Sequence, residues 1–182
     1  MIGGEAEHGI RSLEIHRYDH IQGPAAAPVT LIEYGDFQCP NCGEAFAIVK
    51  QLRETLGDDL RFVYRHFSLV RIHSYAELAA EAAGAQNRFW HMHDYLFENQ
   101  YAVSPDFLAK AAEDLHLDVT RYIHDLKERA YTKRVQDDLA SGARAGVHGT
   151  PTFFINGVRH PGSYDFDSMI QAIRDQRRGL AA

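Results

Sequence analysis

The chain has 182 residues, of which 45% are hydrophobic and 24% charged, and its net charge at pH 7 is −6. This composition is typical of one globular domain, or of one domain with an insertion, and excludes an intrinsically disordered chain. The negative charge argues against nucleic acid as a partner, because nucleic-acid-binding domains carry a basic stripe. No apolar run approaches the roughly 18 residues that cross a bilayer, so we expect no transmembrane helix and no membrane partner.

The two ends of the chain are predicted to be flexible tails, residues 1–12 and residues 179–182. Residues 1–20 are polar and lack the apolar stretch of a signal peptide. As written, the chain is therefore expected to be cytoplasmic, whereas removal of a leader would make it periplasmic or exported. The two cysteines are too few for a disulfide-stapled secreted scaffold.

Strand and helix patterns alternate in the first third of the chain. The β-branched and aromatic run at 29–34 predicts a buried strand. Apolar residues then recur at spacings of three and four, which predicts an amphipathic helix with Pro40 near its first position and Gly57 as its stop. Alternating apolar residues at 60–67 predict a second strand.

The middle of the chain, about 74–146, contains only helical patterns. Ser104 and Asp118 are suited to cap two of these helices. A block of this size is too large for a loop, and we interpret it as a helical insertion.

Strand patterns return near the C-terminus. Residues 152–155 and 158–159 flank Asn156-Gly157, which predicts a tight hairpin. A last helix is expected to open near Asp165, with Gly179 able to end it. The predicted order is strand, helix, strand, helical block, hairpin and helix, which indicates an α/β fold.

Cys39 and Cys42 form a Cys-x-x-Cys pair at the predicted strand-to-helix junction. The first turn of a helix presents unpaired N–H groups and the positive end of the helix dipole, and both stabilise a thiolate at Cys39. The two intervening residues place Cys42 one helical turn away. The pair can therefore cycle between dithiol and disulfide through a mixed disulfide.

Two other interpretations of the pair are weaker. A zinc site needs two more ligands, and none of the 11 histidines completes a recognisable pattern, so we predict no metal. A structural disulfide across so short a loop would constrain the unfolded chain little. We interpret His66, His73, His91 and His93 as packing and capping residues of the insertion.

Three segments resemble the DsbA-like thiol–disulfide oxidoreductases. Residues 29–42, VTLIEYGDFQCPNC, resemble the active-site strand and helix of that family, and residues 149–157, GTPTFFING, resemble its second signature. Residues 89–94, FWHMHD, lie where similar members carry a comparable motif. The resemblance covers about residues 18–175.

The resemblance implies a thioredoxin-like fold, a central mixed sheet flanked by helices, with an inserted all-helical subdomain. On this interpretation the thioredoxin-like domain comprises residues 13–67 and 149–178, and the insertion comprises residues 68–148.

The resemblance also implies roles for individual residues. Cys39 would be the attacking cysteine and Cys42 the resolving one, while Pro151 would be a cis proline against the disulfide. The backbone of Gly149 and Thr150 would then be free to pair with a substrate strand by β-augmentation. Substrate contacts are also expected at the two residues between the cysteines, Pro40 and Asn41. Asn41 departs from the histidine or tyrosine of better-known relatives and cannot supply positive charge.

Two titratable residues are further candidates. Glu33 interrupts an apolar strand, where such enzymes often hold a buried carboxylate; burial would raise its pKa and let it exchange a proton with Cys42. Alternatively, Glu33 points outward into solvent. His148 could add positive charge beside Cys39 when protonated.

The function implied is thiol–disulfide exchange, as an oxidase or a reductase, in which the cysteine pair carries the electrons and no other cofactor is needed. The expected partners are protein thiols and disulfides or glutathione, together with an unidentified redox partner. Two alternatives remain open: a redox-gated binding or sensor module of the same fold, and a glutathione-transferase-like relative.

Overall fold

The computed structural model describes residues 13–68 and 74–180. The predicted N-terminal tail, 1–12, lies outside these residues, as do 181 and 182 of the predicted C-terminal tail. Residues 179 and 180 belong to the last helix, which continues past Gly179 to Leu180. The prediction that Gly179 ends this helix is therefore wrong by one residue.

The structure contains a five-stranded mixed sheet in the order β1-β3-β2-β4-β5. The strands are β1 (His20–Gln22), β2 (Val29–Gly35), β3 (Leu60–His66), β4 (Thr152–Ile155) and β5 (Val158–Arg159). Strand β2 pairs parallel with β3 and antiparallel with β4, so it lies at the centre of the sheet.

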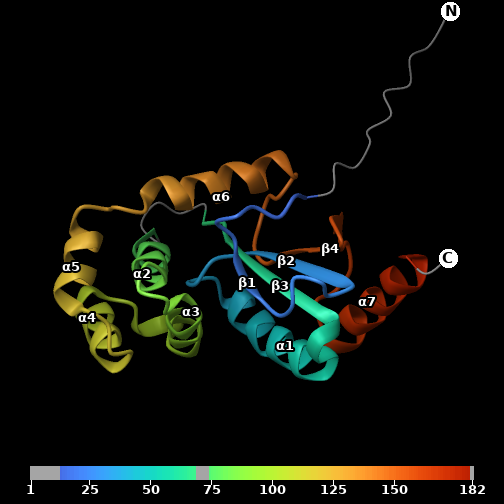
Figure 1. Ribbon diagram of the computed structural model, residues 1–182, viewed down its shortest axis with the longest axis horizontal. Helices are drawn as coiled ribbons and strands as arrows, with labels where there is room; N and C mark the ends of the chain where they lie inside the picture. Colours follow the sequence, from blue (N-terminus) through green and yellow to red (C-terminus); the bar gives the residue numbers. More distant parts are fainter. Residues whose placement is uncertain (1–12, 69–73, 181–182) are drawn as a thin grey trace, which may run out of the picture.

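Helices cover both faces of the sheet and extend beyond it on one side. They are α1 (Pro40–Leu56), α2 (Ser74–Gly84), α3 (Phe89–Glu98), α4 (Pro105–Asp114), α5 (Val119–Lys127), α6 (Thr132–Arg144) and α7 (Phe166–Leu180), with short 3-10 helices η1 (Gly57–Asp59) and η3 (Gln100–Ala102). Figure 1 shows α1 and α7 on one face of the sheet, α6 on the other, and α2 to α5 grouped beside it. Helices α2 to α6 lie between β3 and β4, which confirms the predicted helical insertion.

The local signals in the sequence explain several element ends. Ser104 and Asp118 accept hydrogen bonds from the backbone of Phe107 and Arg121, and so cap α4 and α5 as predicted. Asn156 and Gly157 both have positive φ, as the two-residue hairpin turn requires. The three-residue strand β1 was not predicted, because a segment this short carries no periodic signal.

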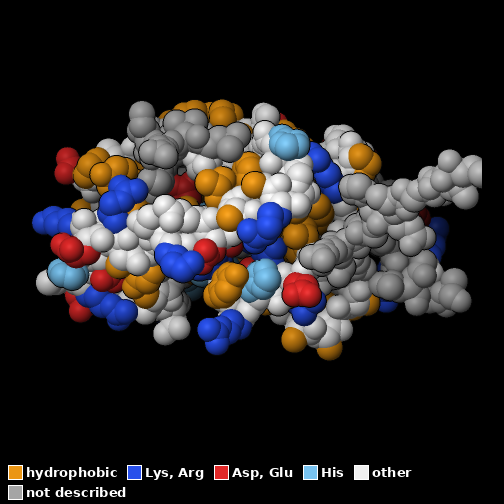
Figure 2. All heavy atoms as spheres, turned by 90° about the horizontal axis from the view of Figure 1, so that it is seen from above, with side chains coloured by type: hydrophobic (Ala, Val, Ile, Leu, Met, Phe, Trp, Pro, Cys, Tyr) orange, Lys and Arg blue, Asp and Glu red, His pale blue; other side chains and the backbone are white. Residues whose placement is uncertain are grey.

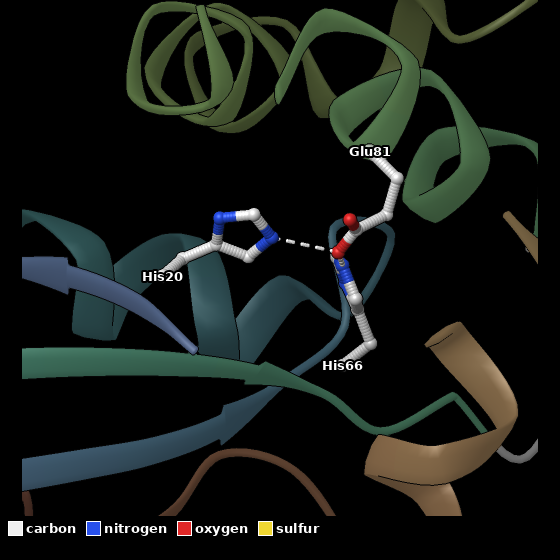
Figure 3. Close-up of side chains that lie close together, drawn as sticks. All are labelled: His20, His66 and Glu81. Atoms are coloured by element: carbon white, nitrogen blue, oxygen red, sulfur yellow. Dashed lines mark hydrogen bonds and ion pairs between the residues drawn. The ribbon is translucent and has the colours of Figure 1, made fainter. Parts of the chain in front are cut away.

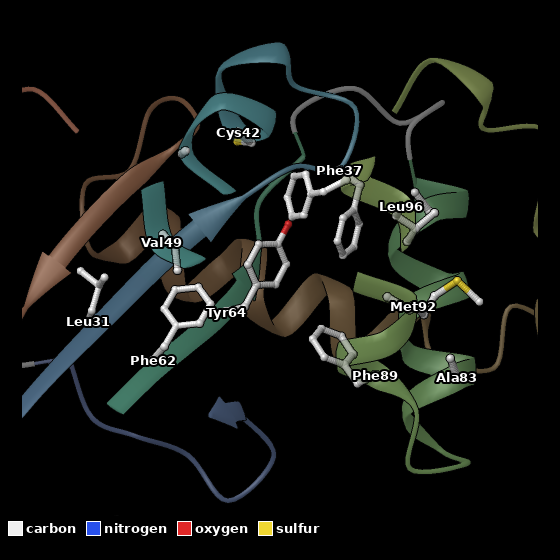
Figure 4. Packing of buried hydrophobic residues seen from close by; sticks show 14 of the residues in the cluster. Leu31, Phe37, Cys42, Val49, Phe62, Tyr64, Ala83, Phe89, Met92 and Leu96 are labelled. Carbon is white, nitrogen blue, oxygen red and sulfur yellow. The ribbon is translucent and has the colours of Figure 1, made fainter. Parts of the chain in front are cut away.

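Strand β2 is buried along its whole length, because its two faces contribute to two apolar clusters. Leu31 packs on the face covered by α1 and α7, together with Phe62 and Tyr64 of β3. Figure 4 shows Tyr64 between Phe37 and Phe89 of α3, and its ring contacts both, so the insertion and the sheet share one core.

The opposite face of the sheet holds Ile32, Tyr34 and Val63 in the second cluster. It also buries Arg65, whose guanidinium donates to the carboxylate of Asp19 at 2.7 and 3.0 Å and to Tyr34 Oη at 2.9 Å. These partners satisfy a charge that would otherwise be costly to bury.

The described helices include none long and apolar enough to span a membrane. Lys and Arg side chains alternate with Asp and Glu over the face shown in Figure 2.

Candidate redox site

The cysteine pair lies at the junction of β2 and α1, as the sequence predicts. Cys39 occupies the N-cap position of α1 with extended backbone, and Pro40 is the first helical residue. The backbone amides of Cys42 and Gly43 donate to the Cys39 carbonyl at 3.0 and 3.2 Å, which closes the first turn. Cys39 is partly exposed, Cys42 is buried, and both are free thiols in this structure. Only Cys39 is therefore accessible to a macromolecule.

A second segment from the far end of the chain approaches Cys39. The Thr150–Pro151 peptide bond is cis, as predicted, and the Cys39 thiol donates to the Thr150 carbonyl at a sulfur–oxygen distance of 3.4 Å. Gly149 is exposed, and its carbonyl accepts from Thr152 Oγ1 at 2.7 Å. The fold thus brings together the two segments that the sequence singled out.

A cavity of about 410 Å³ borders this loop. Its lining includes Pro151, Phe153, His160 and Tyr164. It leaves space beside the cis proline for part of a polypeptide.

Glu33 points into the protein, as the functional interpretation of this residue requires. Its exposure is 2%, and its Oε1 atom has no hydrogen-bond partner among the described residues. Burial raises the pKa of the Glu33 carboxyl to about 8. A carboxyl with this pKa can hold or release a proton near neutral pH.

The Cys42 thiol shares this buried environment. Burial raises its pKa, and the negative charge of Glu33 adds to that effect. The Asp36 backbone amide, which donates to Cys42 Sγ at 3.5 Å, and the Thr150 side chain act in the opposite direction. Ionised Glu33 and an ionised Cys42 thus disfavour each other, so the two groups titrate as a coupled pair.

The remaining predicted residues lie at the surface. Pro40 and Asn41 are exposed and accessible to a substrate. His148 is exposed and, within the part of the chain that the structure describes, makes no hydrogen bond to Cys39. Its predicted role beside Cys39 therefore stays a prediction.

Comparison with known proteins identifies the family. A protein-family model described as thioredoxin matches residues 16–175, which is most of the chain. The chain belongs to this family, in its DsbA-like branch.

Solved structures of similar proteins support the assignment. α-DsbA1 of Wolbachia pipientis is 17% identical, with a TM-score of 0.82 over 93% of this chain and 96% of that one. A thioredoxin-like oxidoreductase from Silicibacter pomeroyi DSS-3 is 25% identical, with a TM-score of 0.75 over 88% and 92% of the two chains. The predicted fold, a DsbA-like thioredoxin fold with a helical insertion between β3 and β4, is confirmed.

Higher sequence identity is found in a much longer protein. A protein named Na(+)/H(+) antiporter NhaA 1, from Salinispora arenicola, is 44% identical over 158 residues. The match covers 85% of this chain but only 24% of that relative. The chain therefore spans about a quarter of the length of this curated relative.

One residue of the site was missed in the sequence. Gln100, in η3 of the DsbA-like insertion, donates from Nε2 to the carbonyls of Phe37 and Cys39, both at 2.9 Å. Gly43 provides the room for this contact, since a Cβ there would lie 2.0 Å from Gln100 Oε1. No local sequence pattern predicts this contact, because Gln100 and Cys39 are 61 residues apart in the chain.

A second cluster in this DsbA-like protein has the residue types of a metal site. His20 and His66 each place Nε2 within hydrogen-bond distance of the same oxygen of Glu81, at 2.7 and 2.8 Å (Figure 3). These three side chains could contribute two imidazoles and a carboxylate to a metal ion. However, Glu81 already forms short hydrogen bonds to both rings, and the Arg134 guanidinium lies 3.9 Å from it. A neighbouring cation opposes metal binding, so we interpret the cluster as a buried polar network that joins β1, β3, α2 and α6.

Proposed function

We propose that this protein exchanges disulfides with protein substrates, with Cys39 as the attacking residue and Cys42 as the resolving residue of a Cys-Pro-Asn-Cys pair. The observation that carries the proposal is the contrast between the two thiols: Cys39 is accessible and touches the Thr150 carbonyl, whereas Cys42 is buried behind it. The N-terminus of α1 favours negative charge at the cysteine that caps it.

In the reducing direction, the Cys39 thiolate attacks a substrate disulfide, forms a mixed disulfide and releases one substrate thiolate. Glu33 then accepts the proton of Cys42, and the Cys42 thiolate attacks Cys39 Sγ. This step forms the Cys39–Cys42 disulfide and releases the second substrate thiol. The substrate gains two electrons and the enzyme loses two.

In the oxidising direction the same bonds form and break in reverse. A substrate thiolate attacks Cys39 Sγ of the enzyme disulfide, and the Cys42 thiolate leaves and takes a proton from Glu33. The second substrate thiolate then displaces Cys39 to complete the substrate disulfide. A buried leaving thiolate needs such a proton donor because solvent cannot reach it.

The cis-proline loop supports a protein as the substrate. The Thr150 backbone borders Cys39, where an extended chain could add to it by β-augmentation. Main-chain pairing of this kind tolerates many sequences. Glutathione, with a short backbone, would use the cysteines but little of this surface.

The direction of exchange depends on the reduction potential, which depends on how strongly the protein stabilises the Cys39 thiolate. A reductase would suit a reducing compartment, and an oxidase would suit an oxidising one. A reductase would need a partner that reduces the Cys39–Cys42 disulfide, and an oxidase would need a partner that oxidises the two thiols.

The test is to trap the mixed disulfide. With Cys42→Ser, we expect a covalent adduct between Cys39 and an unfolded protein whose single cysteine is held as a mixed disulfide with thionitrobenzoate, which is the leaving group; mass spectrometry detects the adduct. Cys39→Ser should give no adduct, because buried Cys42 cannot reach the substrate. Adducts at Cys42 in the Cys39→Ser variant would reverse the assigned roles.

The same experiment separates the enzyme from a redox-gated binding module. Such a module would bind its partner in one redox state without forming an adduct, and Cys39→Ser would keep that affinity. A glutathione-transferase-like enzyme would still bind glutathione noncovalently after Cys42→Ser and would show no adduct with protein substrates.

A further inference from the structure

The hydroxyl of Tyr64 is a buried polar group to which the exchange steps above give no role. Tyr64 is fully buried in β3, and its Oη atom has no hydrogen-bond partner among the described residues. A buried phenol usually reaches a partner, because an unpaired hydroxyl is costly to bury. The groups around this hydroxyl therefore indicate what it can bind.

Tyr64 lies beside Glu33 in the sheet. The two residues are register partners on the parallel strands β3 and β2. Leu31 and Phe62, two positions earlier on each strand, are also partners and belong to the same apolar cluster as Tyr64. Because side chains two positions apart share a face of a strand, Glu33 and Tyr64 project from the same face of the sheet.

Gly35 leaves the space in which the Tyr64 side chain approaches Glu33. A Cβ at Gly35 would lie 2.6 Å from Cε2 and 2.9 Å from Oη of Tyr64, and 3.0 Å from Oε1 of Glu33. The first two distances are shorter than real side-chain contacts, so only glycine leaves the ring where it is. The two unpaired oxygens, Tyr64 Oη and Glu33 Oε1, are therefore close to the same backbone position.

Packing fixes the Tyr64 ring in this position. The ring stacks on Phe37 at a centroid distance of 5.2 Å and contacts Phe89 and Phe97 at 6.3 and 6.0 Å. Figure 4 shows its hydroxyl end pointing toward Phe37. Because the ring is fixed, the hydroxyl stays close to Glu33 while its hydrogen is free to rotate.

The phenol keeps its proton in this environment. Burial raises the pKa of the Tyr64 hydroxyl well above its usual value, and so do the acidic groups around it. In order of decreasing effect, these groups are Cys42, Glu33, Glu77 and Asp36. Tyr64 is therefore a permanent hydrogen-bond donor among groups that can become negatively charged.

The three carboxyls around Tyr64 differ in what they can accept. Asp36 Oδ1 already accepts from the backbone amide of Gln38 at 2.8 Å. Glu77 of α2 is buried, and burial raises its pKa well above the usual range, so it is neutral near pH 7. Ionised Glu33 is therefore the acceptor that best matches the Tyr64 donor.

Two histidines also face the Tyr64 ring. The imidazoles of His66 and His93 lie 5.6 and 4.8 Å from it, measured between ring centroids. His66 Nε2 is paired with Glu81, and His93 Nδ1 with Asp94. Burial lowers the pKa of His93, which keeps this ring neutral near pH 7.

We propose that Tyr64 is a positioning residue for proton exchange: its hydroxyl donates a hydrogen bond to the Glu33 carboxylate and so holds that carboxylate as the base for Cys42. The inference rests on the proposed function and adds the group that makes an ionised, buried Glu33 possible. Tyr64 keeps its own proton throughout, and the proton that moves passes from Cys42 to Glu33. A hydrogen bond to the charged form of an acid favours that form.

The test is a titration of the Glu33 carboxyl by carbon-13 NMR in the oxidised protein, in which the disulfide leaves Cys42 without a proton. The signal is identified by its absence from Glu33→Gln. Tyr64→Phe removes the hydroxyl and keeps the packed ring. We expect its Glu33 midpoint to lie about one pH unit or more above that of the wild type, a tenfold change in the ionisation constant, because a hydrogen bond to a charged group is lost.

Two matched variants are the controls. Tyr122 of α5 is also buried with an unpaired hydroxyl, and burial alone raises its pKa, so Tyr122→Phe should leave the Glu33 midpoint unchanged. Glu77→Gln replaces one neutral side chain by another and should leave it unchanged too. A midpoint that does not rise in Tyr64→Phe, or that rises equally in Tyr122→Phe, would overturn the inference. A midpoint that falls in Glu77→Gln would do the same, because an ionised Glu77 would take the Tyr64 hydrogen bond.

Kinetics separate the inference from the function on which it rests. With an excess of the symmetrical disulfide of thionitrobenzoate, the Cys39 thiolate displaces one thionitrobenzoate, and Cys42 displaces the second as the enzyme disulfide forms. In Tyr64→Phe, the second phase should reach its midpoint at higher pH without a lower limiting rate, whereas damage to the fold would slow it at every pH. The first phase should be unchanged.

The two failures give different traces in this experiment. Absence of a second phase in the wild type would overturn the proposed function, because Cys42 would not resolve the mixed disulfide. A normal second phase with the same midpoint in the wild type and in Tyr64→Phe would overturn the inference alone.

Discussion

Glu33 is a carboxyl buried in the central strand of the sheet. It is the one carboxylate in a strand whose seven residues are all buried. Its negative charge raises the pKa of the Cys42 thiol. An unpaired carboxyl in such a place is destabilising when ionised. The proposed transfer of a proton to the buried Cys42 thiol would account for a carboxyl at this position.

The first prediction concerns the pH dependence of stability. Below about pH 4.5 Glu33 is protonated in both the folded and the unfolded chain, and it adds no pH dependence. Between that value and about pH 8 the unfolded chain releases the proton while the folded chain keeps it, so the free energy of unfolding falls as pH rises. The total decrease is on the order of 4 to 5 kcal/mol.

Glu33→Gln should therefore flatten the curve of unfolding free energy between pH 5 and pH 8 and make the variant more stable than the wild type at pH 8. It should also slow formation of the Cys39–Cys42 disulfide from the mixed disulfide. Denaturant unfolding and stopped-flow exchange measure the two effects. Glu54→Gln, at an exposed position of α1, is the control; an unchanged slope in Glu33→Gln would place the Glu33 carboxyl in solvent.

At the scale of elements, one side chain connects the insertion to the active-site turn. Gln100 binds two carbonyls of that turn, and Gly43 leaves room for it. Alanine is favoured over glycine inside a helix by about 1 kcal/mol. Whether Gly43→Ala raises or lowers the free energy of unfolding therefore depends on whether the Gln100 side chain is present.

The second prediction is that Gly43→Ala destabilises the wild type but stabilises the Gln100→Ala variant by about 1 kcal/mol. In the wild type, the new methyl group must displace an amide that is held by two hydrogen bonds. The four variants of a double-mutant cycle, unfolded in denaturant, give the coupling directly. Equal effects of Gly43→Ala in both backgrounds would show that Gln100 does not hold the turn.

The network around Glu81 connects other elements in the same way. Its carboxylate lies between His20 of β1 and His66 of β3, and both hydrogen bonds lower the pKa of Glu81 despite its burial. Burial lowers the pKa of His20, and also that of His93. Below about pH 6.5 the unfolded chain therefore binds protons at these histidines that the folded chain does not, and stability falls as pH falls.

The third prediction is that Glu81→Gln costs about 1 to 3 kcal/mol of stability at pH 7, because an amide oxygen accepts the two imidazole hydrogen bonds less strongly than the carboxylate, while partly buried Arg134 keeps Asp138 as its partner. Unfolding in denaturant measures the loss. Asp114→Asn, which removes one partner of the exposed Lys110–Asp114 pair, should change stability little and is the control. Comparable effects of the two substitutions would mean that the Glu81 network contributes no more than a surface ion pair.

At the scale of the whole molecule, the sequence predicts what is local or strongly patterned. The strand at 29–34, the helix from Pro40 and the Asn156-Gly157 turn agree with the structure because each follows from its neighbours in the chain. The three-residue strand β1 and the burial of Arg65 could not be predicted in this way. Both depend on pairing with distant partners, Tyr64 in one case and Asp19 in the other.

The candidate site follows the same division. Cys39 and Cys42 are neighbours in sequence, and the resemblance to a known family indicated Pro151 and Glu33. The Gln100 contact and the Glu81 network arise only from tertiary packing between the insertion and the sheet.

The measurement that tests the central claim most directly is the redox equilibrium of Cys39 and Cys42 with glutathione at neutral pH. We predict reversible, two-electron exchange with one defined potential, lying between roughly −270 mV, as in thioredoxin, and −120 mV, as in DsbA. A value near the first would indicate a reductase, and a value near the second an oxidase. Absence of any exchange, or exchange that survives Cys39→Ser unchanged, would contradict the account.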